Sequence, residues 1–348
     1  MPSTSIDTFF ACIIIITTAL IATAFVGSTL QTSITNTKDL NKENYLNALS
    51  NNIVTNPGTP LNWGTNSVVP VDFGLADNSS AVPYEIDLDK ITRLNTQSNF
   101  TLSYFDMVHS AKLNDIALGI TVSQIMRIDI QQLSSSTIGG NVSFTFKILT
   151  SVDSKPVSSS LHCYVAANNY LNDIANDTSD IGLGYVTVQI PSVSSNSAIL
   201  IVFARTAFDD RITSYALYNF ADSMQEATPK NEVLTLSPLN YTLSLFSNSS
   251  GITIQGSYLF SFEYLQNLSY DQNSTQFQIP KIIDKSPFVI VVCGIDNGSN
   301  FQEWVSYPQV PLKAGSSFAG SEQNVFSYII TIKEALYRIN ISLGGLSP

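Results

Sequence analysis

The feature that most constrains this chain is a run without charged residues from Thr8 to Leu30. It contains four consecutive isoleucines, Ile13 to Ile16. A helix needs about 20 mainly apolar residues to cross a hydrocarbon core of roughly 30 Å. The run is longer than the apolar core of a cleaved signal peptide, which spans about 7–15 residues. We therefore expect a retained membrane span over about residues 8–30, with membrane lipid or sister helices as its partners.

The sequence after this run stays compatible with a helix to about Val54. Asn56 and Pro57 then end the helix, because proline lacks an amide hydrogen and restricts the residue before it. We expect residues 1–55 to form one long helix, apolar at first and amphipathic later. The expected buried face of the second part contains Ile34, Tyr45, Leu49 and Ile53.

The charge of the chain argues against nucleic-acid binding and favours an exterior location. The formal net charge is −11, which repels phosphate backbones. No lysine or arginine precedes the apolar run, so basic residues give no orientation. Asn-x-Ser/Thr sequons favour an extracellular body that carries N-linked glycan. Their asparagines are Asn78, Asn99, Asn141, Asn176, Asn240, Asn248, Asn267, Asn273, Asn297 and Asn340.

Beyond the helix the pattern is mainly β. Residues 56–138 are expected to form a small α+β collar. It would contain a short helix capped by Ser103 or a neighbour, an extended segment at 89–94 and a strand pair over 116–130. Short alternating strands separated by turns predict two immunoglobulin-like β-sandwich domains, at 139–222 and 232–346. The polar segment 225–231 is expected to link them.

Three cysteines, Cys12, Cys163 and Cys293, have no metal-ligand spacing. Cys163 and Cys293 lie in strand-like sequence, where we expect small buried hydrophobic residues, with a disulfide between them as the alternative.

Few residues are candidates for catalysis or ligand binding, and no cofactor is expected. Three acids occupy every second position, at Glu85, Asp87 and Asp89, so an extended segment would place their carboxylates on one face. That face would be either solvated or bound to a cation such as calcium. The two histidines, His109 and His162, come without a GxSxG motif. His162 and Cys163 are neighbours on a strand and should point to opposite faces. We expect no enzyme activity.

Particular segments resemble archaeal type IV pilin-like surface proteins. They are the apolar N-terminal helix, the sequence NPGTPLNWG at 56–64, FGLA at 73–76 and DKITRLN at 89–95. The resemblance covers about the first third of the chain. It implies that the apolar helix packs into a filament core, with Phe9 and Phe10 in the assembly surface. It further implies that Asp7 neutralises the terminal amine of a neighbouring subunit; the alternative is that Asp7 caps the helix.

The expected function is therefore that of a pilin-like structural or adhesion protein of the cell membrane, single-pass, with its C-terminal bulk outside the cell. It would act as a homo-oligomer or filament. The alternative is a membrane-anchored extracellular module that binds a surface glycan or a cation. A surface hydrolase that uses the histidines and the clustered acids is a third hypothesis.

Overall fold

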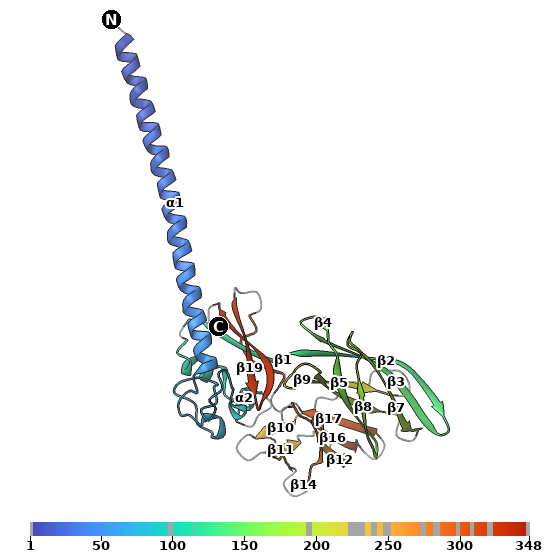
Figure 1. Ribbon diagram of the computed structural model, residues 1–348. Coiled ribbons are helices and arrows are strands. Elements are labelled where there is room, and N and C mark those ends of the chain that lie inside the picture. Colours follow the sequence, from blue (N-terminus) through green and yellow to red (C-terminus); the bar gives the residue numbers. More distant parts are fainter. Residues whose placement is uncertain are drawn as a thin grey trace. The chain divides into compact units, whose positions relative to one another are not determined.

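The computed structural model describes residues 3–96, 100–113, 115–192, 197–221, 234–237, 242–245, 252–271, 276–280, 286–296, 300–306, 310–318 and 323–345 (Figure 1). The chain divides into two compact units, Met1–Asn51 and Asn52–Pro348. The first is helical and the second is mainly β.

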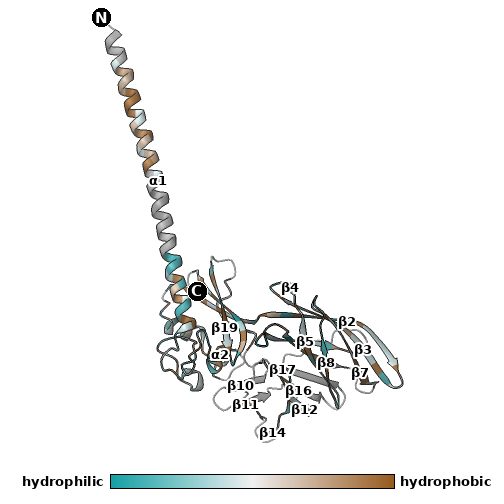
Figure 2. Cartoon of the chain, in the orientation of Figure 1, coloured by the Kyte–Doolittle hydropathy of each residue, from teal (hydrophilic) through white to brown (hydrophobic). Residues whose placement is uncertain are grey.

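The expected long helix is confirmed as α1, Ser3–Thr55. Its apolar part, Thr8–Val26, has a mean hydropathy of 2.6, and none of it is buried. Figure 2 shows the change from apolar to polar residues along the helix. The expected buried face was partly wrong: Ile53 is buried and Leu49 half-buried, but Tyr45 is exposed. The side chain of Ile34 lies outside the described residues. The buried positions recur with the helical period. These positions are Leu46, Ser50, Ile53 and Val54.

The described part of the collar contains three short helices. They are η1 (Trp63–Thr65), α2 (Leu88–Leu94) and α3 (Tyr104–Ser110). As expected, Ser103 caps α3, because its hydroxyl accepts the N–H of Asp106. The expectation of an extended segment at 89–94 was wrong, because Asp87 caps a helix there by accepting the N–H groups of Asp89 and Lys90.

The collar also contains an antiparallel sheet that joins distant parts of the sequence. Its strand order is β18 (Leu312–Gly315), β1 (Ala117–Gln124), β20 (Ala335–Gly344) and β19 (Gln323–Ile332). We call it the β1 sheet. Two strands lie over 116–130 as expected, but their pairing with each other was wrong, because β1 pairs with β18 and β20 while the next strand pairs elsewhere. The C-terminal strands therefore belong to the collar and do not close a second sandwich over 232–346.

Two further antiparallel sheets cover residues 126–220. The β3 sheet contains β2 (Met126–Ile138), β3 (Asn141–Val152), β4 (Lys155–Pro156) and β7 (Leu183–Pro191). The β5 sheet contains β6 (Tyr170–Asp177), β5 (Ser159–Ala167), β8 (Ala198–Thr206) and β9 (Thr213–Phe220). Since β2 pairs with β3, the collar ends before residue 126 and not at 138.

Two more sheets lie between residues 234 and 306. The β12 sheet contains β13 (Leu265–Asn267), β12 (Ile252–Phe260), β16 (Val289–Asp296) and β17 (Asn300–Ser306). The β11 sheet contains β10 (Leu234–Ser237), β11 (Thr242–Leu245), β15 (Gln276–Gln278) and β14 (Tyr270–Asp271). The expected linker at 225–231 lies outside the described residues.

Three apolar cores hold these four sheets together as successive layers. Phe144 of the β3 sheet and Val202 of the β5 sheet share the first core. Ile201, on the other face of β8, packs in a second core with Val291 of the β12 sheet. Leu243 and Val292 share the third core, between the β12 and β11 sheets. The two middle sheets are therefore covered on both faces, which explains why β8 and β16 are apolar without alternation.

The two strand cysteines are buried, as expected for small hydrophobic residues, and neither is in a disulfide. Cys163 belongs to the core between the β3 and β5 sheets, whereas Cys293 belongs to the core between the β5 and β12 sheets. The β5 sheet therefore separates the two thiols, and the alternative of a disulfide between them was wrong.

Candidate functional site

The apolar part of α1 exposes large hydrophobic side chains on every side. Two of them, Phe9 and Phe10, contact each other edge to face with ring centroids 6.4 Å apart. The others are Ile13, Ile14, Ile15, Ile16, Leu20, Ile21, Phe25 and Val26. Because these positions are not restricted to one stripe, the segment is suited to an apolar environment on all sides.

The threonines in this segment are compatible with the same environment. The hydroxyls of Thr17, Thr18 and Thr23 donate to the carbonyls of Ile13, Ile14 and Ala19 at 2.8, 2.7 and 2.7 Å. A hydroxyl that donates a hydrogen bond within its own helix does not need water as an acceptor. These polar residues therefore do not interrupt the apolar character of the span.

Asp7 lies within α1, which begins at Ser3. A cap residue precedes the first turn, so the alternative that Asp7 caps the helix was wrong. Its side chain lies outside the described residues, and its role in assembly remains a prediction.

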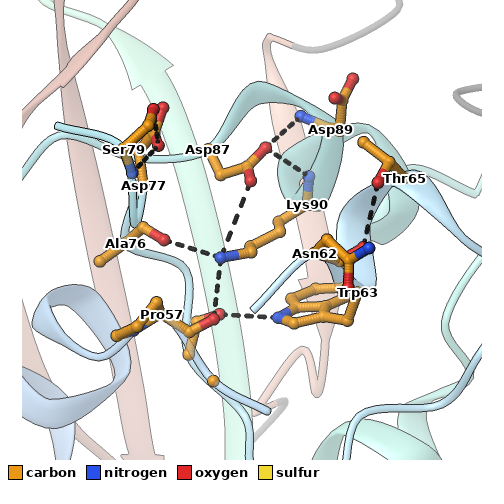
Figure 3. Close-up of polar contacts among 12 residues, drawn as sticks. Pro57, Asn62, Trp63, Thr65, Ala76, Asp77, Ser79, Asp87, Asp89 and Lys90 are labelled. Carbon is orange, nitrogen blue, oxygen red and sulfur yellow. Dashed lines mark hydrogen bonds and ion pairs between the residues drawn. The ribbon is translucent and has the colours of Figure 1, made fainter. Parts of the chain in front are cut away.

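A buried lysine organises the loops of the collar (Figure 3). Lys90 is 0% exposed, and its ammonium donates to the carbonyls of Pro57 at 2.8 Å and Ala76 at 2.7 Å. The ammonium also lies 3.7 Å from Oδ2 of Asp87. Burial lowers the pKa of Lys90 and raises that of Asp87, while each charge favours the ionised form of the other. The arrangement ties helix α2 to the loop that follows α1.

Arg93 and Trp63 extend this arrangement. The guanidinium of Arg93 donates to the carbonyls of Trp63 at 2.6 Å and Val68 at 2.8 Å, and lies 5.6 Å from the Trp63 ring centroid. The indole N–H of Trp63 donates to the carbonyl of Gly74 at 3.0 Å. These donors bond backbone carbonyls of the loops, so the cluster holds the loops together. Sequence reasoning missed it because lysine and arginine in a short helix normally indicate a solvated face.

The three predicted carboxylates do not form a cation site. Glu85 accepts a hydrogen bond from the hydroxyl of Ser80 at 2.6 Å, and Asp87 is occupied as the cap of α2. Asp89 lies within the helix, so the alternation expected for an extended segment is lost. Among the residues that the structure describes, no group of three histidines, cysteines or acids could hold a metal ion.

In the part of the chain that the structure describes, the histidines contact aromatic rings and a carboxylate. The ring of His162 stacks on Tyr164 at 4.6 Å, and its Nε2 lies 3.7 Å from Oδ2 of Asp173. Cys163 points to the opposite face of the strand, where burial raises the pKa of its thiol to about 12. The predicted separation of this pair is confirmed. His109 lies in α3 and stacks on Phe105 at 6.2 Å.

The described sequons lie on accessible parts of the body. Asn78, Asn141, Asn176 and Asn267 are exposed, and Asn340 is half-buried in β20. The remaining predicted sites, Asn99, Asn240, Asn248, Asn273 and Asn297, lie outside the described residues. Their modification remains a prediction.

Comparisons with known proteins assign no family. No family model matches the chain, and no curated protein matches it. Among solved structures, wild-type OgpA from Akkermansia muciniphila is similar over 29% of this chain and 30% of its own length, with 11% identity and a TM-score of 0.20. A likeness of this size supports no argument about fold or activity.

Proposed function

We propose that this chain is a cell-surface structural or adhesion protein of the type IV pilin-like kind, held at the cell membrane by α1. The observation that supports the proposal is the exposed apolar segment Thr8–Val26 within a continuous helix that extends to Thr55. A fully exposed apolar segment needs lipid or sister helices around it, because water disfavours that much apolar surface. The mainly β body would then face the exterior, and its sheets would form immunoglobulin-like sandwiches.

The anchor is tested by adding charge near the middle of the span. An aspartate at the centre of a membrane helix costs about 2.5–3.5 kcal/mol, so I16D together with L20D should cost about twice that amount. After membranes are extracted with alkaline carbonate, we expect the wild-type chain to stay in the membrane pellet. The double variant should appear in the supernatant. The matched control is F105D, which adds a charge at an exposed position of the body.

Two results would overturn the proposal that α1 anchors the chain in the membrane. One is release of the wild-type chain by carbonate. The other is a mature N-terminus beyond Val26 in mass spectrometry of the protein from its native cells, which would show that the segment is a removed signal sequence. Mass shifts at exposed sequons such as Asn176, together with cleavage of the body by protease added to intact cells, would support the exterior location.

Assembly through α1 is tested separately from anchoring. If Asp7 neutralises a neighbouring terminal amine, D7N should abolish filaments visible by electron microscopy while leaving the chain in the membrane fraction. The matched control D180N removes a carboxylate from an exposed turn of the body and should leave the filaments intact. Wild-type cells or purified full-length protein without filaments would restrict the proposal to a monomeric or weakly associated anchor.

A further inference from the structure

The side chains of β20 alternate between the core and the open face of the β1 sheet. Ile339 and Ile341 are 0% exposed, whereas Asn340 and Ser342 are half-buried. Because neighbouring side chains of a strand point to opposite faces, the asparagine and the serine of this sequon both lie on the open face. Within the described residues, neither side chain forms a hydrogen bond. The amide of Asn340 is therefore available to carry a group on that face.

Strand β19 places two exposed apolar side chains around Asn340. Ser327 lies directly opposite Asn340, and Val325 and Ile329 lie on the same face two residues to either side of Ser327. Val325 is 53% exposed and Ile329 is 49% exposed. Such diagonal neighbours in a sheet lie about 7–8 Å apart. A sugar attached to Asn340 would therefore reach both side chains.

Other parts of the chain already cover the two ends of this face. At one end, the ring of Phe318 lies over Gly119, where a side chain would otherwise be. At the other end, Arg338 forms an ion pair with Asp153 at 2.7 Å. The open part of the face lies between them, around Asn340.

A second sequon has the same arrangement on the β3 sheet. Asn141 lies directly opposite Ile138 of β2, across the two-residue turn of Gly139 and Gly140. Ile138 is 69% exposed. Ser143, the third residue of this sequon, lies on the same face as Asn141. Side chains directly opposite each other have Cβ atoms about 4.5–5.5 Å apart, so a sugar on Asn141 would lie beside Ile138.

We propose that N-linked glycans on Asn340 and Asn141 cover these exposed apolar side chains. A glycan is bulky and solubilising, and the C–H groups of its sugar rings would lie against Val325, Ile329 and Ile138. Contact with the sugar removes apolar surface from water, which is favourable. Both sites depend on the proposed exterior location, because N-linked glycan belongs to secreted parts of proteins.

The reaction transfers an oligosaccharide from a lipid-linked phosphate donor, catalysed by a membrane transferase of the cell. The side-chain amide nitrogen loses one proton and forms a bond to the anomeric carbon of the first sugar. The bond from that carbon to the phosphate oxygen breaks, and the lipid phosphate leaves. The transferase also needs the third residue of the sequon, Ser342 or Ser143. Since β20 and β3 each pair on both sides in the folded chain, we expect the transfer to precede their pairing.

The first test is peptide mass spectrometry of the full-length chain from its native cells. We expect glycan mass shifts on Asn340 and Asn141. S342A and S143A destroy the sequons but keep both asparagines, so each should lose the mass shift at its own site. The matched controls S342T and S143T keep the sequons and should keep the shifts.

The second test measures whether the glycans cover the apolar side chains. The purified full-length chain is labelled with a photoreactive diazirine, which reacts with accessible side chains. We expect faster labelling of Val325 and Ile329 in S342A, and of Ile138 in S143A, than in the wild-type chain. Phe208 is 67% exposed and has no sequon near it in the sequence, so its labelling should not change. Unfolding midpoints check that the variants are folded.

An unmodified Asn340 or Asn141 in a chain whose Asn78 is glycosylated would overturn the proposal for that site and leave the exterior location intact. Equal labelling of the wild-type chain and the serine-to-alanine variants would overturn the covering role. A chain without glycan on any sequon would overturn both glycan sites. Cleavage of that chain by protease added to intact cells would still support the exterior location, so the two proposals fail separately.

Discussion

At the scale of single residues, the collar depends on charged groups in unusual surroundings. Lys90 and Arg93 are buried in a helix of seven residues, and their donors satisfy carbonyls from loops far away in the sequence. Hydrogen bonds to charged groups are worth about 1.5–3 kcal/mol each, more than most neutral ones. The loops between α1 and α2 have little regular structure and so rely on these contacts.

Lys90 gives the prediction at this scale. K90M keeps the aliphatic stem but removes the ammonium, and leaves the carbonyls of Pro57 and Ala76 without this donor. We expect the free energy of unfolding to fall by about 2–4 kcal/mol, because buried acceptors without a partner cost about 1–3 kcal/mol each and relief of the buried charge offsets part of the loss. Chemical denaturation measures this change.

The control for K90M is K112M. The Lys112 side chain is 73% exposed and lies 3.3 Å from Asp72, and exposed ion pairs contribute about 0–1 kcal/mol. We therefore expect less than about 1 kcal/mol for K112M. Equal effects of the two substitutions would show that Lys90 does not hold the loops in place.

At the scale of elements, the hydrophobic pattern of each strand reports how many of its faces are covered. Strand β7 alternates buried and exposed residues, because the β3 sheet has one face in the first core and the other in solvent. Strand β8 is buried at nearly every position, because both faces of the β5 sheet are covered. The sequence of β8 therefore contains the information that both faces of its sheet are covered.

Strand β8 gives the prediction at this scale. I201A removes a side chain from the core between the β5 and β12 sheets. We expect a loss of about 2–5 kcal/mol in the free energy of unfolding, as for other buried Ile-to-Ala changes. If Ile201 faced solvent, the loss would be within about 0.5 kcal/mol. We expect a loss that small for the control Q189A, on the exposed face of β7. A loss that small for I201A would contradict the packing of the two sheets.

At the scale of the whole molecule, the two ends of the body meet in one sheet. Strand β20 pairs with β1 from Ala117↔Gly344 to Gln124↔Tyr337. The same region contacts the first pair of sheets, since Arg338 forms an ion pair with Asp153 at 2.7 Å and the N–H of Leu336 donates to the carbonyl of Arg211. The collar therefore requires the last part of the chain.

A truncation tests this dependence. A chain that ends after Ser306 lacks β18, β19 and β20, so β1 loses its partners on both sides. We expect hydrogen exchange of the amides of β1 to become fast while those of β3 stay protected, because unpaired strands open locally. A chain that ends after Gly345 keeps all three strands and is the control. Persistent protection of β1 in the shorter chain would show that the collar folds without its C-terminal strands.

The sequence by itself determined the features that depend on neighbouring residues. The long helix follows from an uncharged apolar run and ends before Pro57, Ser103 caps α3 through a residue three positions away, and alternation marks β3 and β7 as strands. The burial of Cys163 and its separation from His162 follow from the period of a strand. These features arise from local sterics and hydrogen bonding, which short patterns encode.

Only the tertiary structure decided which strands and side chains pair when they lie far apart in the sequence. Nothing in the pattern of β1 distinguishes β2 from β20 as its neighbour, because apolar faces pair without regard to sequence separation. The sequence pattern also does not predict the burial of Lys90, since its ammonium donates to backbone carbonyls, which every residue possesses. Strand order and the environment of a buried charge depend on the packing of the whole body, where the free energy of burial is shared among many distant residues.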